Sequence, residues 1–165
     1  MSRKMIIHSI LLTITAGGQM LAAWLLYDPD ANSSIINLGW GFIFLSAIFG
    51  WLPVFTFRSK GNVKGDSYIN TTKLVDRGLY SIVRHPQYLA GVLMNIGLSL
   101  ITSHWLVILL GIISWGIYYL GTFTEEEKNL VKFGDSYQNY QEHVPRLNFL
   151  LGLFRRFSKK ENRDG

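Results

Sequence analysis

The segment Arg84-His85-Pro86-Gln87-Tyr88 combines a cation, an imidazole and a proline. Pro86 suits the first turn of a helix, because the N–H that proline lacks would have no partner there. Free N–H groups and the helix dipole at such an end favour an anion, and Arg84 and His85 would lie beside it. The same sequence also fits an ordinary helix start, at which the side chain of Arg84 snorkels to the membrane surface. The segment therefore indicates an anion site only if other polar groups join it.

A second candidate is the run Glu125-Glu126-Glu127, which follows a long uncharged stretch. Three successive carboxylates fit a solvated helical turn. They also accept hydrogen bonds from ribose hydroxyls and pair with cationic ligand groups. If the preceding apolar segments form a tight hairpin, this turn returns to the same membrane face as Arg84 and His85. Cations and carboxylates at one interface would together suit a zwitterionic ligand.

The third group of polar and aromatic residues lies at 133–146. Gly134 is expected to end one helix and Asp135 to cap the next. Tyr137 and Tyr140 are three residues apart and so share one face of that helix. Such an amphipathic helix would lie on a membrane surface, and it could also cover a binding site.

The composition points to a membrane. Only 16% of the 165 residues are charged, against about 25% in soluble domains. No Asp, Glu, Lys or Arg occurs at 5–27, 31–57 or 85–124. The net charge of +5 comes from basic residues beside these stretches, which favours anionic lipid head groups over nucleic acid as the partner. The chain has no cysteine, which excludes disulfides and thiolate metal sites, and we predict no metal centre.

The uncharged stretches predict an all-α integral membrane fold with four transmembrane helices. The first two spans are expected at about 5–27 and 35–57. The last stretch has some 40 residues and would reach about 60 Å, twice the hydrocarbon thickness. The polar break Thr102-Ser103-His104 divides it into spans at about 86–101 and 105–123. Amphipathic helices are expected to follow at the C-terminus.

The loop charges predict the orientation of these spans. Basic residues occur at the N-terminus, in the loop after Phe57 (Lys64 among them) and in the C-terminal tail, whereas 28–34 and the turn at Ser103 have none. By the positive-inside rule, both termini are cytoplasmic. We expect one membrane domain over 1–165, in the inner membrane of a cell or its equivalent.

The motifs, taken in order, resemble those of a known family. They are Leu74-Val75, Gly78, Tyr80, Val83, Arg84-His85-Pro86-x-Tyr88, Glu125-Glu126, Phe133-Gly134-x-x-Tyr137-x-x-Tyr140 and Val144-Pro145-Arg146. This order and spacing is similar to that of the isoprenylcysteine carboxyl methyltransferase family, and phospholipid N-methyltransferases share part of it. The resemblance covers 74–146. The chain departs from the family pattern at Leu79, where a proline is common, and at Ala90. Counting back from Phe133 selects Glu125 and Glu126 as the family pair.

The resemblance implies S-adenosylmethionine-dependent methyl transfer at the cytoplasmic membrane face. The acceptor would be lipophilic: a carboxylate, amine or thiol of a prenylated or lipid substrate. By position, the resemblance assigns cofactor binding to Arg84, His85, Pro86, Tyr88, Glu125, Glu126 and Tyr137. It assigns catalytic roles to His85, Glu126 and Arg146, of which Arg146 would also help to close the site.

Two other classes of protein remain open at this point. Membrane sterol reductases share a related C-terminal pattern and bind NADPH, although they are usually longer. A non-catalytic membrane protein could also retain the fold. Asn95 is a polar residue within the third predicted span, so we expect it to face the bundle interior and to contact the substrate.

Overall fold

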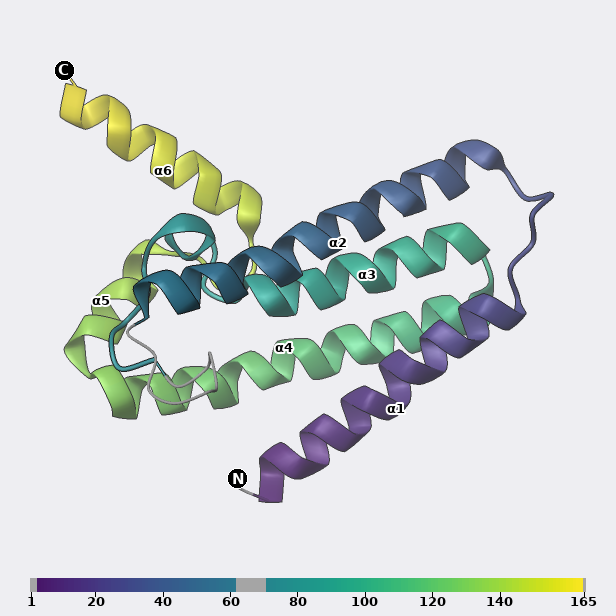
Figure 1. Cartoon of the computed structure of the whole chain (residues 1–165), viewed down its shortest axis with the longest axis horizontal. Helices are drawn as coiled ribbons and strands as arrows, with labels where there is room; N and C mark the ends of the chain where they lie inside the picture. Colours follow the sequence, from purple (N-terminus) through teal and green to yellow (C-terminus); the bar gives the residue numbers. More distant parts are fainter. Residues whose placement is uncertain (1–2, 62–70, 165) are drawn as a thin grey trace. The chain divides into compact units, whose positions relative to one another are not determined.

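The computed structural model describes residues 3–61 and 71–164, with the side chains of all of these except 4, 5 and 159–164. Over these residues the chain is helical and contains no strand. The elements are α1 (Arg3–Leu25), α2 (Ser33–Lys60), the 3-10 helix η1 (Gly78–Ser81), α3 (Pro86–Thr102), α4 (Trp105–Phe133), α5 (Asp135–His143) and α6 (Phe149–Asp164). Figure 1 labels the six α-helices. Lys64, one of the basic residues used to predict the orientation, lies outside the described residues.

Three helices are long and apolar enough to cross a membrane, judged by length and composition over the described residues. They are Ile6–Leu25 within α1, α2 and α4. The predicted spans 5–27, 35–57 and 105–123 fall on these helices. α3, which matches the predicted span 86–101, has 17 residues. At 1.5 Å per residue it reaches about 26 Å, somewhat less than the hydrocarbon thickness of about 30 Å. The all-helical membrane class is thus confirmed, with three clear candidate spans where four were predicted.

Two breaks separate helices that would otherwise run together. Ser103 has a φ of 49°, and the chain turns there from α3 into α4. Gly134 has a φ of 54°, which glycine adopts at little cost, and it separates α4 from α5. The prediction that Asp135 caps α5 is wrong. Gly134 is the N-cap, and its carbonyl accepts the N–H of Tyr137 at 2.9 Å, so the helix begins one residue earlier than expected.

The chain forms two compact units. The bundle unit comprises Met1–Ile48 and Tyr88–Thr124, and the head unit comprises Phe49–Gln87 and Glu125–Gly165. α2 and α4 each begin in the bundle unit and end in the head unit. The head unit also contains η1, α5 and α6. The three motif groups around Arg84, Glu126 and Arg146 all belong to this second unit.

Inside the bundle unit, a buried amide joins three helices. Gln19 of α1 is fully buried, and its Nε2 donates to the backbone oxygens of Asn95 in α3 and Val107 in α4, at 3.1 and 3.2 Å. α2 contacts α3 through glycines: a Cβ on Gly39 would lie 2.8 Å from the oxygen of Gly97. Small residues therefore permit the close approach expected of membrane helices.

Candidate active site

Two backbone hydrogen bonds bring the first and third motif groups together. The N–H of Arg84 donates to the oxygen of Pro145 at 3.0 Å, and the N–H of His85 donates to the oxygen of Arg146 at 3.2 Å. The next residue, Pro86, has no N–H and begins α3, as its sequence context predicts. The chain before α3 is thereby fixed against the chain after α5, and the side chains of Arg84 and Arg146 come from segments about 60 residues apart.

Glu126 is the centre of an ionic cluster. Arg146 binds it in a bidentate manner, with Nε to Oε1 at 3.1 Å and Nη2 to Oε2 at 2.6 Å. Arg84 Nη2 and His85 Nε2 each lie 3.1 Å from Oε1. Only 5% of Glu126 is exposed, and His85 is 3% exposed. We name these four residues the Glu126 cluster. It contains two guanidinium groups for one carboxylate, so it has one positive charge in excess before His85 is considered.

The surroundings of Glu126 set its ionisation. Glu126 lies beyond the apolar part of α4, which ends at Phe123. Burial by itself would raise the pKa of Glu126. The hydrogen bonds from His85 and Arg146 and the charge of Arg84 outweigh that effect and lower the pKa from 4.5 to about 2. Glu126 is therefore a carboxylate at neutral pH and a weak proton acceptor.

The three adjacent glutamates differ sharply in their environment. Glu125 has a side chain that is 44% exposed, and its Oε2 lies 3.8 Å from Nδ1 of His85. Glu127 is exposed. The family spacing selected Glu125 and Glu126, and the structure places these two at the cluster, with Glu126 inside it and Glu125 at its edge.

Two buried tyrosines of α5 support the cluster. Tyr137 is 2% exposed and is hydrogen-bonded to the side chain of Asn129. Burial is the main cause that raises the pKa of Tyr137 to about 12, so its hydroxyl stays protonated. Tyr140 donates its hydroxyl to the backbone oxygen of Tyr80 at 2.6 Å, which ties α5 to η1. Burial also raises the pKa of Tyr140.

Sequence reasoning missed Asn129 as the partner of Tyr137. It lies on α4 three residues after Glu126, so both are on one helix face, and this spacing could have identified it. The role of Tyr140 as a connection to η1 was missed as well. No sequence signal indicates it, because its acceptor is a backbone carbonyl 60 residues away.

Two residues of the predicted site belong to the bundle unit instead. The ring of Tyr88 packs edge-on against Tyr118, with 6.1 Å between ring centroids. Asn95 is 4% exposed, and its Nδ2 donates to the oxygen of Gly111 at 3.4 Å. The expected interior position of Asn95 is confirmed. The contact of Asn95 with a substrate and of Tyr88 with a cofactor stay predictions.

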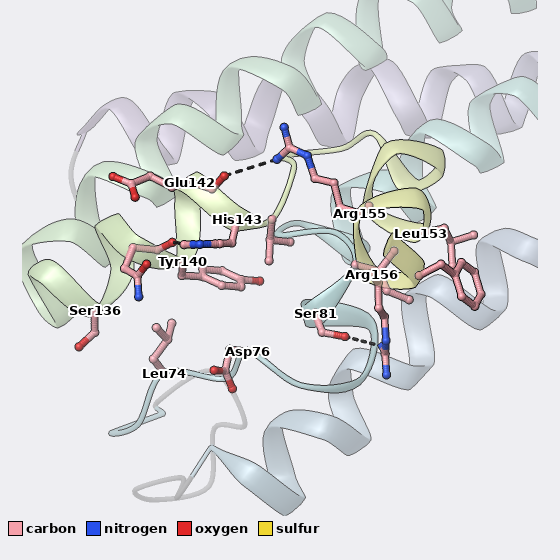
Figure 2. Close-up of a pocket in the computed structure, with 15 residues that line it drawn as sticks. Leu74, Asp76, Ser81, Ser136, Tyr140, Glu142, His143, Leu153, Arg155 and Arg156 are labelled. Atoms are coloured by element: carbon pink, nitrogen blue, oxygen red, sulfur yellow. Dashed lines mark hydrogen bonds between the residues drawn. The ribbon is translucent and has the colours of Figure 1, made fainter. Parts of the chain in front are cut away.

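The head unit also contains an open cavity of about 1310 Å³ beside α5 and α6 (Figure 2). Its walls combine apolar side chains with charged ones, including Leu74, Ile82, Leu153, Asp76, Glu142 and Arg156. Arg84, His85 and Glu126 do not line it, whereas Tyr140 does. The candidate active site is assigned to the Glu126 cluster, because the groups that can bind charge and transfer protons are gathered there.

The Glu126 cluster has the donors that a zwitterionic cofactor requires. Nε of Arg84 is buried and has no hydrogen-bond partner among the described residues. Together with the excess positive charge, this free donor suits a carboxylate. Glu125 at the edge suits an ammonium group. The residues therefore fit the amino-acid end of S-adenosylmethionine, the cofactor that the family resemblance implies.

Comparison with known proteins identifies the class. The family model described as phospholipid methyltransferase matches residues 34–135, more than half of the chain. The chain belongs to this family. The matched segment contains Arg84, His85 and Glu126, while Arg146 lies after it.

A more particular likeness is to the protein-S-isoprenylcysteine O-methyltransferase of Schizosaccharomyces pombe. It is 32% identical over 73 residues, which are 44% of this chain and 31% of that protein. The match therefore spans less than a third of the length of that relative. No solved structure matches the chain.

Proposed function

We propose that this protein transfers a methyl group from S-adenosylmethionine to a lipophilic acceptor at the cytoplasmic face of the membrane. Family membership and the apolar helices support a membrane methyltransferase. The observation that carries the proposal is the Glu126 cluster, in which two arginines and a histidine surround one buried carboxylate. S-adenosylmethionine, when bound, supplies an electrophilic methyl group on a sulfonium.

Glu126 is best assigned as a positioning residue. Its pKa of about 2 makes it a poor base, and both of its oxygens are occupied by cations. It holds the guanidinium groups of Arg84 and Arg146 in fixed directions. These two groups would bind the cofactor carboxylate with the charge that Glu126 leaves uncompensated. Fixed donors of this kind orient a reactant without further ordering at the moment of reaction.

His85 and Glu125 are the candidates for proton transfer. A carboxylate acceptor needs no base at neutral pH, whereas an amine acceptor must lose a proton before it attacks. Both ring nitrogens of His85 face glutamate oxygens, at 3.1 Å from Glu126 and 3.8 Å from Glu125. Glu125 is the more exposed of these glutamates and could accept a proton from a bound amine. Tyr137, which stays protonated, would help to exclude water from the site.

The proposal includes four membrane spans, because α3 is added to the three candidate spans α1, α2 and α4. It also places both termini in the cytoplasm. α3 follows directly after Arg84 and His85, which would lie at the membrane surface. The absence of cysteine allows single cysteines to be placed for labelling in intact cells. Cysteines at Asn32 and Ser103 should react with an impermeant maleimide from outside, and one at Ser136 only after permeabilisation. Labelling of Ser136 from outside would contradict the orientation.

Cofactor binding is the decisive test. Calorimetry on detergent-solubilised protein should detect binding of S-adenosylmethionine and of its demethylated product, and none of NADPH. Arg84→Ala should weaken this binding about ten-fold or more, because a charge-assisted hydrogen bond contributes about 1.5–3 kcal/mol. Arg77→Ala is the matched control, since Arg77 is exposed and precedes η1. Binding of NADPH would assign the protein to the reductases, and folded protein that binds neither would favour a non-catalytic role.

The acceptor can be identified by transfer of label. Lipid extracts incubated with the protein and isotope-labelled S-adenosylmethionine should yield a labelled lipophilic product by mass spectrometry. Asn95→Leu should change which acceptors are labelled more than it changes cofactor affinity. If it alters neither activity nor stability, Asn95 is not part of the site.

A further inference from the structure

Helix α6 contacts the rest of the head unit through the side that carries Gly152, Arg155 and Arg156. Gly152 is buried, and a Cβ there would collide with the backbone carbonyl of Ile82. Arg155 Nη1 donates to the oxygen of Glu142 at 3.4 Å, and Arg156 Nη1 donates to Oγ of Ser81 at 2.5 Å, both drawn in Figure 2. The helix is therefore held by hydrogen bonds and by a close backbone approach.

Three apolar side chains of α6 point away from these contacts. Leu150, Phe154 and Phe157 occur at a spacing of four and then three residues, so they form one stripe along the helix. They are 77%, 73% and 67% exposed. An amphipathic helix on a water-soluble protein buries such a stripe, whereas here the polar side is packed and the apolar side is open.

The start of α6 contacts α2, one of the three candidate membrane-spanning helices. The ring of Phe149 packs edge-on against Phe49 of α2, with 5.0 Å between ring centroids. Phe49 precedes Arg58, the first charged residue at this end of α2, by nine residues, or about 13 Å along the axis. Leu52, three residues after Phe49 and so on the same side of α2, is 45% exposed. The start of α6 therefore contacts a side of a candidate spanning helix that also carries an exposed apolar side chain.

We propose that α6 is embedded in the cytoplasmic leaflet, with Leu150, Phe154 and Phe157 among the acyl chains. Lipid is the occupant that this contact favours, because Phe149 packs against Phe49 within the uncharged stretch of α2. Arg155 and Arg156 stay on the protein side, where carbonyl and hydroxyl oxygens satisfy them. The inference requires α2 to span the membrane and does not depend on methyl transfer.

Spin labelling in vesicles tests this directly. A nitroxide is attached to Phe154→Cys or Phe157→Cys in the full chain, reconstituted in phosphatidylcholine–phosphatidylglycerol vesicles. Both positions should show frequent collisions with oxygen and few with a water-soluble nickel chelate, as expected for lipid exposure. Gln138→Cys on polar, exposed α5 is the control and should show the reverse.

Two results would overturn the proposal. A nickel accessibility at Phe154 and Phe157 equal to that at Gln138 would place α6 in water. If neither oxygen nor the nickel chelate reaches the labels, and the labels show dipolar broadening, then a second copy of the chain covers the apolar stripe of α6. If either variant fails to fold, Leu150→Cys provides the same measurement on the same stripe. Cofactor affinity is a separate readout, so failure here leaves the proposed function open to its own test.

Discussion

Gln19 in the bundle unit and Glu126 in the head unit are both buried polar residues, yet their surroundings differ. Gln19 is neutral and bonds to backbone oxygens of Asn95 and Val107, while its own Oε1 has no partner among the described residues. Glu126 is charged, and three cationic or ionisable side chains contact it. An amide can be buried among apolar helices at modest cost, whereas an ion requires counter-ions. The head unit provides them from several segments, and this is why the candidate active site is assigned to it.

The largest expected effect is that of Glu126→Ala. Removing this carboxylate leaves Arg84 and Arg146 side by side without a counter-ion, which should destabilise the head unit by about 3–5 kcal/mol. Glu127→Ala is the matched control, because Glu127 is the exposed neighbour, and it should change stability by less than about 0.5 kcal/mol. Thermal unfolding in detergent, with proteolysis of the head unit as a second probe, measures both. Equal effects would mean that Glu126 is not the centre of the ionic cluster.

Lowering the pH should next distinguish the Glu126 cluster from Gln19, because only Glu126 is ionised. The folded pKa of Glu126 is about 2, below its ordinary value of 4.5. A depressed carboxylate pKa stabilises the fold fully above about pH 4.5, and this stability is lost as pH falls through about 2. The shift corresponds to roughly 3 kcal/mol. Melting temperatures of wild type and Glu126→Gln should therefore converge on acidification. Parallel pH profiles would show that the carboxylate charge does not stabilise the head unit.

A smaller effect is expected for Tyr140→Phe. The hydroxyl that donates to the oxygen of Tyr80 at 2.6 Å is removed, and the buried carbonyl loses a partner. Stability should fall by about 1–1.5 kcal/mol, and S-adenosylmethionine should bind more weakly because η1 leads into Arg84. Tyr27→Phe is the control, since Tyr27 is 46% exposed. Unchanged cofactor affinity in a destabilised variant would limit Tyr140 to a structural role.

Gln19→Leu should have the smallest effect of the four. Hydrogen bonds between side chains in membrane helices contribute about 0.6 kcal/mol on average, and leucine removes an acceptor that has no partner among the described residues. The loss of stability should be the same at pH 7 and pH 4, because neither glutamine nor leucine is ionisable. Thermal unfolding at both pH values checks this. A loss as large as that of Glu126→Ala would show that the bundle unit depends on its amide as the head unit depends on its ions.

The sequence by itself determined the helical membrane class and indicated the residues of the candidate site. Uncharged stretches of this length require helices in lipid, because every backbone group must be satisfied within its own segment. The helix breaks at Ser103 and Gly134 also follow from local residue types, although the exact cap of α5 did not. The family resemblance, carried by motif order and spacing, selects Arg84, His85, Glu126 and Arg146 without any knowledge of contacts.

The tertiary structure alone decided how these residues meet. The sequence suggested cations and carboxylates at one interface that would bind a zwitterionic ligand, whereas Arg84 and Arg146 both contact Glu126. This arrangement depends on the hydrogen bonds from Arg84 and His85 to Pro145 and Arg146. Backbone pairing between segments about 60 residues apart has no signature in residue type, because every residue has a carbonyl and all but proline an N–H. The outward apolar stripe of α6 was likewise decided by packing, since periodicity shows that a helix has two faces but not which one the protein covers.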